Sequence, residues 1–130
     1  MATRYGFGKT VQLPFDEAIE RVTAALAQEG FGILSDIDVA AALKKKLNKE
    51  IPPYRILGAC NPPLADRAIA AEPSIGLLLP CNVLVRQDAA GAVHVEFMDT
   101  DAVLALVDQP SIAALAGEVK QRLQRVMIAM

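Results

Sequence analysis

The 130-residue chain has no tryptophan, and its aromatic residues are two tyrosines and four phenylalanines. It has two cysteines and one histidine, so it cannot supply the four Cys/His ligands typical of a structural zinc site. With His94 alone, no Ser/His/Asp set can be proposed. There is no phosphate-binding glycine loop, because Gly6 and Gly8 fall in a predicted strand and not at a strand-to-helix turn. These absences exclude the common metal and nucleophile signatures.

The chain also lacks an excess of either charge and any long apolar run. Net charge is −2 and 22% of residues are charged, which gives no reason to expect nucleic-acid binding. The longest uncharged stretch, 73–85, contains two prolines and is shorter than the ~20 residues of a membrane-spanning helix. No apolar segment follows the charge at Arg4, so no signal peptide is predicted. We therefore expect a cytoplasmic protein without membrane contact, whose cysteines are reduced.

What the chain does have is a high content of aliphatic residues. Hydrophobic residues make up 53% of the sequence, enough for one domain spanning 1–130 with a core in 5–107 and a C-terminal helix at about 110–129. Alternating apolar residues and apolar runs predict strands at 4–13, 31–38, 54–60, 75–79, 81–86 and 93–98. Three- and four-residue spacing of apolar residues predicts helices at 14–29, 39–49, 62–71, 100–107 and 110–129. This order predicts an α+β two-layer sandwich with a mixed or mainly antiparallel sheet and helices on one face.

Two of the predicted strands, 54–60 and 81–85, are apolar at both parities. A strand with one face in water should alternate between apolar and polar residues. If helices cover one face of the sheet, a second subunit would cover the other. On this ground we expect a homodimer.

The cysteines occupy two nearly mirror-image segments, Cys60-Asn61-Pro62 and Pro80-Cys81-Asn82. Each joins an apolar run to a Pro/Asn breaker, so the thiols could lie at one end of one sheet. Cys60 directly precedes a predicted helix whose cap is Asn61, and a helix N-terminus favours a reactive thiolate and can hold an anion. The predicted ligand-binding residues are therefore Cys60, Asn61, Cys81 and Asn82. The alternative is that both cysteines are buried structural residues.

Other polar residues support weaker hypotheses. A two-thiol site for a soft ion such as Cu(I), completed by Met98, is conceivable, but no metal or cofactor is expected. His94 shares strand parity with Glu96 and Met98, as a surface or packing residue would. Asp36 and Asp38 share one strand face, and Asp99 and Asp101 flank Thr100. Paired carboxylates can do acid/base work, but Asp101 also suits a helix first turn and Asp99 or Thr100 a cap, so we expect structural roles for all four aspartates.

Several motifs, taken in order, resemble those of the prokaryotic domain-of-unknown-function family 302. They are GFG at 30–32, DIDV at 36–39, YRILGACNP at 54–62, IGLLLPCNV at 75–83 and FMD at 97–99. The resemblance implies a compact α+β sandwich and a tendency to dimerise. It implies no activity, cofactor or catalytic residue.

Two functions remain open on the sequence. The first is a domain that binds a small ligand or carries out thiol or sulfur chemistry near the two cysteines. The second is a non-catalytic dimeric interaction or structural module. Whether the chain is an enzyme stays open.

Overall fold

A five-stranded antiparallel sheet forms the centre of the molecule, with strand order β1-β5-β4-β3-β2. The computed structural model describes residues 2–130. The strands are β1 (Gly6–Val11), β2 (Gly32–Asp38), β3 (Tyr54–Cys60), β4 (Cys81–Gln87) and β5 (Val93–Met98). The helices are α1 (Phe15–Gln28), α2 (Val39–Leu47), α3 (Pro62–Ala71), α4 (Thr100–Leu104) and α5 (Pro110–Ala129), with short 3-10 helices η1 (Pro73–Leu78) and η2 (Ala105–Val107). The predicted α+β class is confirmed.

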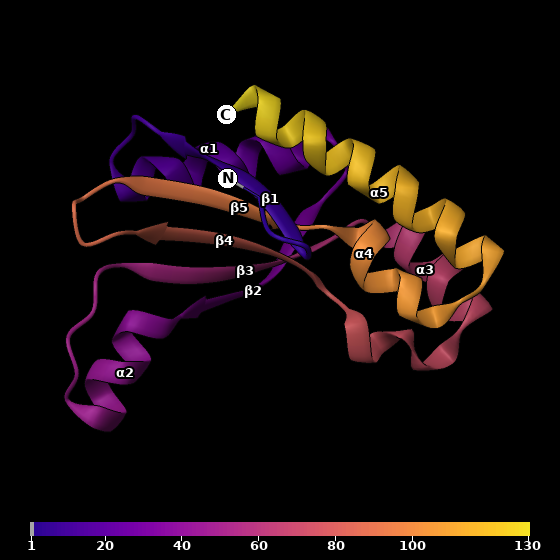
Figure 1. The fold of residues 1–130 in the computed structure, drawn as a ribbon, viewed down its shortest axis with the longest axis horizontal. Coiled ribbons are helices and arrows are strands. Elements are labelled where there is room, and N and C mark those ends of the chain that lie inside the picture. The colour runs from indigo at the N-terminus through magenta and orange to yellow at the C-terminus, as the bar shows by residue number, and fades with distance from the viewer. Residues whose placement is uncertain (1) are drawn as a thin grey trace.

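The elements gather at opposite ends of the sheet (Figure 1). α3 and α4 lie at one end, and α2 lies at the other, the end that also carries the β4–β5 turn. α5 runs across the molecule and packs against α1, α3 and α4. We call the end that carries α3 and α4 the helical end, and the end that carries α2 and the β4–β5 turn the hairpin end.

Apolar stripes on α1 and α5 form the core. Ala18, Val22 and Leu26 of α1 are fully buried, and the stripe predicted on the last helix is buried throughout. Its members are Ile112, Leu115, Val119, Leu123 and Val126. Gly30 follows α1 with φ +84°, a conformation that glycine adopts without strain, and lets the chain turn into β2.

One face of the sheet packs on this core. Successive residues of a strand point to opposite faces, residues paired across strands share a face, and every second residue of 81–85 in β4 and of 93–97 in β5 is buried. The buried row on β4 and β5 consists of Val83, Val85, Val93, Val95 and Phe97. The opposite parity places Ile37, Ile56, Leu84 and Glu96 in one row across four strands. Of these, Ile37 is 50% exposed. We call this second side the outer face.

The strand predicted at 75–79 is wrong. Residues Pro73–Leu78 form η1, and the chain enters β4 through a cis Leu79–Pro80 bond. The Glu72 carboxylate accepts a hydrogen bond from Ser74 N at 3.1 Å, and Pro73 occupies the first turn, where its missing N–H leaves no gap. A short apolar run fits a strand and a buried helical turn equally well, so its pattern did not distinguish them.

Side-chain caps begin three helices where the sequence predicted helix starts. Asp38 accepts from Ala41 N, Asn61 from Leu64 N and Asp99 from Ala102 N, at 2.9, 3.3 and 3.2 Å. Across residues 2–130, no helix combines the length and apolar character needed to cross a bilayer.

Candidate functional site

A cavity of about 390 Å³ lies at the helical end of the sheet. The ends of β2, β3 and β4 form one side, and α3, η1, α4 and α5 form the rest. Buried residues form its floor, and exposed residues form its rim. The floor includes Phe31, Ala59, Asn61, Leu64, Ala68, Cys81, Leu104, Leu115 and Val119, and the rim is Leu34, Ser35, Ile69 and Gly76. The cavity is therefore an apolar hollow that opens between the edge strand β2 and α3.

Both cysteines line this cavity. Cys81 pairs with Ala59 on the core face, whereas Cys60, the next residue along β3, pairs with Gly32. Both thiols are free, Cys81 buried and Cys60 half-buried. Burial, and secondly the charge of Cys60, raise the pKa of the Cys81 thiol to about 11. Cys81 is thus protonated at neutral pH and is a poor nucleophile there.

Asn61 also lines the cavity, but structural hydrogen bonds occupy both ends of its amide. Its Oδ1 caps α3, and its Nδ2 donates to the Glu29 carbonyl at 3.4 Å. The first turn of α3 has no N–H left for an anion: Pro62 and Pro63 lack one, and those of Leu64 and Ala65 bond to Asn61. The anion site considered at this helix start is therefore not supported.

Asn82, the fourth predicted residue, does not line the cavity. It pairs with Gly58 on the outer face and is exposed. Sequence reasoning missed Ser35, which also pairs with Gly58 and lies at the rim. The register shift between Ile33 and Ser35 brings it there. A shift of this kind depends on pairing with the neighbouring strand, and no local sequence signal marks it.

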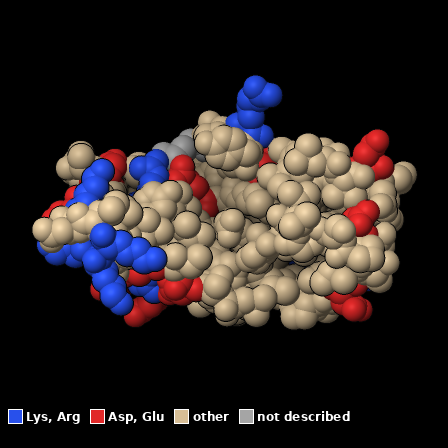
Figure 2. Space-filling view, turned by 90° about the horizontal axis from the view of Figure 1, so that it is seen from below, with Lys and Arg blue, Asp and Glu red and all other residues tan. Residues whose placement is uncertain are grey.

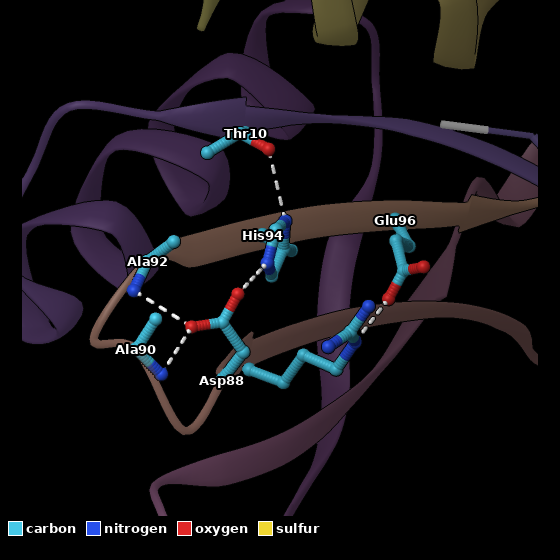
Figure 3. A network of polar contacts seen from close by, with 7 residues as sticks. Thr10, Asp88, Ala90, Ala92, His94 and Glu96 are labelled. Carbon is cyan, nitrogen blue, oxygen red and sulfur yellow. Dashed lines mark hydrogen bonds and ion pairs between the residues drawn. The ribbon is translucent and has the colours of Figure 1, made fainter.

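A polar network occupies the opposite, hairpin end (Figure 3). His94 Nε2 lies 2.7 Å from Asp88 Oδ2, and His94 Nδ1 lies 3.0 Å from Thr10 Oγ1. Asp88 Oδ1 accepts from Ala90 N and Ala92 N at 2.9 and 3.0 Å. The His94 hydrogen bond and then these backbone bonds lower the pKa of Asp88. The network thus ties the β4–β5 turn to the edge strand β1.

Other charged groups form pairs that support the fold. Arg86 Nε donates to Glu96 Oε2 at 2.9 Å on the outer face. Arg55 holds Asp36 through Nε at 3.0 Å and through a second bond from Nη2, and these hydrogen bonds lower the pKa of Asp36. Within 2–130, no group of three or more His, Cys, Asp and Glu side chains is placed to hold a metal ion.

Fold and site together define a small α+β domain with an apolar, thiol-lined cavity at one sheet end. The model of the family described as "Domain of unknown function DUF302" matches residues 7–130, and the chain belongs to this family. A crystal structure of an uncharacterised conserved DUF302 protein from Bacillus stearothermophilus is similar, with a TM-score of 0.90 and 27% identity over 98% of each chain. No curated protein matched the chain.

Proposed function

We propose that this DUF302 chain binds a small molecule in the cavity at the helical end of the sheet. The observation that carries the proposal is the cavity itself: about 390 Å³, with an apolar floor, an exposed rim and few polar groups. Ligand sites in proteins have this form and this order of volume. The proposal takes the cytoplasm as the compartment, where both thiols stay reduced.

The finer alternative, thiol or sulfur chemistry, rests on Cys60. The raised pKa of Cys81 opposes a reactive pair, and Cys81 lies on the buried floor. If Cys60 is reactive, a small alkylating agent labels it quickly near neutral pH and leaves Cys81 unlabelled. Slow labelling of both cysteines in the folded protein would eliminate this alternative and leave the thiols as part of the lining.

Ligand binding is tested by adding hexan-1-ol to the isotopically labelled protein and following amide NMR signals. We expect saturable shifts gathered around Cys60, Ala65 and Gly76. Gly76→Phe should weaken binding by about tenfold, since a Cβ at Gly76 meets no atom within 4 Å and a large ring there occupies the rim.

Leu106→Phe is the control for that substitution. Leu106 lies in η2, is 77% exposed and does not line the cavity, so a ring there reaches into solvent. Its affinity for hexan-1-ol should equal that of the unchanged chain. Shifts spread over the whole surface, or equal losses in the two variants, would count against the cavity as a binding site.

A second candidate is a non-catalytic interaction module that dimerises through the outer face. Ile37, Ile56 and Leu84 favour it, because they form an apolar row on the side away from the core. Burying such a row against a second copy removes apolar surface from water. Glu96 and Arg86 would remain paired beside it.

Sedimentation at micromolar concentration tests the dimer. Leu84→Lys should turn a dimer into a monomer by placing a charge in the row. Leu106→Lys is the control, since Leu106 lies in η2 and is already 77% exposed. A monomeric unchanged chain would overturn this candidate without affecting the ligand proposal.

A further inference from the structure

The cavity lining contains no charged side chain, which separates it from two other hollows of the described chain. One of about 310 Å³ contains Asp16, Asp38 and Arg55, and another of about 300 Å³ contains Lys9 and Arg21. Burying a charge without a partner is costly. A charged group of a ligand would find no counter-charge in the cavity at the helical end.

On the face that Figure 2 shows, no cationic rim lies toward the helical end either. In Figure 2 the lysines and arginines gather mainly on the left, at the end of the molecule that carries α2 in Figure 1. α2 and the segment after it contain Lys44, Lys45, Lys46 and Lys49. The right-hand part, toward the helical end, is uncharged apart from a few acidic residues (Figure 2). This distribution disfavours a carboxylate or phosphate headgroup.

One polar side chain in the lining has no hydrogen-bond partner among residues 2–130. The Asn61 amide is used at both ends, whereas the Ser35 hydroxyl makes no hydrogen bond to the described protein atoms. Ser35 Oγ lies over Gly58, next to the Pro80 ring and at the rim. It can both donate and accept a hydrogen bond.

We infer that the cavity takes an uncharged ligand with an apolar body, and that the Ser35 hydroxyl binds the ligand's polar group at the rim. The inference rests on the proposed function and names the ligand class. The apolar body lies against the floor, near Cys81 and Leu115, where it displaces no protein hydrogen bond. A neutral hydroxyl or carbonyl group at its end meets Ser35.

A series with one tail and three headgroups tests the charge rule: hexan-1-ol, hexylammonium and hexanoate, each followed by amide NMR at neutral pH. We expect hexan-1-ol to bind about tenfold or more tightly than either ion. Hexanoate should be the weakest, because the nearby surface charges are acidic. Hexanoate binding as tightly as the alcohol would overturn the inference while leaving the cavity a ligand site.

Ser35→Ala tests the contact at the rim. This substitution should weaken the binding of hexan-1-ol by about fivefold, which is the effect of losing one neutral hydrogen bond. Affinity for hexane should be unchanged, and Ser35→Thr, which keeps the hydroxyl, should retain alcohol binding. Equal losses for alcohol and hydrocarbon, or no loss at all, would remove Ser35 from the site. If no compound of the series binds at all, the proposed function itself fails.

Discussion

The two ends of the sheet differ in how their polar side chains are partnered. At the hairpin end, Asp88, His94 and Thr10 bond to one another and to backbone N–H groups, so these side chains are already partnered. At the helical end, apolar side chains leave a cavity that the chain does not fill, and the Ser35 hydroxyl has no partner among residues 2–130. Polar residues that satisfy each other support a fold, whereas a hollow with an unpartnered hydroxyl is suited to a ligand.

Although the helical end contains a cavity, Gly58 beside it is tightly packed, and Gly58→Ala should have the largest effect on stability. A Cβ at Gly58 would overlap Ser35 Oγ and lie 2.8 Å from Pro80 Cγ. Because the Pro80 ring is rigid, we expect a loss of about 3 kcal/mol in unfolding free energy by denaturant titration. Gly32→Ala is the control and should change little, since nothing lies within 4 Å of its Cβ position.

A double mutant separates the contribution of the Ser35 contact to the Gly58→Ala effect from that of the Pro80 contact. In a Ser35→Ala background, Gly58→Ala should cost less, because the hydroxyl is gone and only the Pro80 contact persists. An equal cost in both backgrounds would show that the Ser35 contact does not restrict this position.

The second prediction uses the buried thiol at the cavity end. The folded chain holds the pKa of Cys81 at about 11, above its ordinary value of 9.0. Between these values the unfolded chain loses the proton first, so stability is full below pH 9 and falls as pH rises to 11. The loss amounts to about 3 kcal/mol, or 1.4 kcal/mol per pH unit.

Denaturant titration at several alkaline pH values measures this slope. Cys81→Ala has no titrating group at position 81, so its unfolding free energy should fall less steeply between pH 9 and 11 than that of the unchanged chain, whatever its stability at neutral pH. Parallel curves for the two proteins would mean that the Cys81 thiol titrates normally and is less buried than the structure places it.

Local signals predicted much of the fold. Strand 54–60 ends at Cys60, as expected, because the Asn61 cap and the prolines after it mark a helix start in the sequence itself. The segment 75–79 was mispredicted, because its five apolar and glycine residues carry no periodicity; residues 75–78 belong to η1, whose start Glu72 caps.

The site was only partly predictable, because local sequence signals locate some of its residues and strand pairing locates the others. Cys60 ends β3, Asn61 follows it directly and Cys81 begins β4. Because the ends of neighbouring strands meet in space, the sequence could suggest that these residues gather at the cavity. Asn82 follows Cys81 directly, yet strand parity turns it to the outer face. Ser35 reaches the rim through a register shift that exists only once β2 pairs with β3. Which face a strand residue points to, and which residue it pairs with, decide whether it lines the cavity. Neither can be read from the composition of the sequence.

The last prediction concerns the hairpin end, where partnered polar groups should contribute stability and nothing else. His94→Ala removes the hydrogen bonds to Asp88 and Thr10 and should lower the unfolding free energy by about 2 kcal/mol. Thr10→Val removes the bond to Nδ1 alone and should cost about 1 kcal/mol, since Thr10 is exposed. Neither change should alter the affinity for hexan-1-ol, because neither residue lines the cavity. A variant that kept its stability but lost ligand affinity would break the division between the two ends, and would mean that the His94 network communicates with the cavity along β4 and β5.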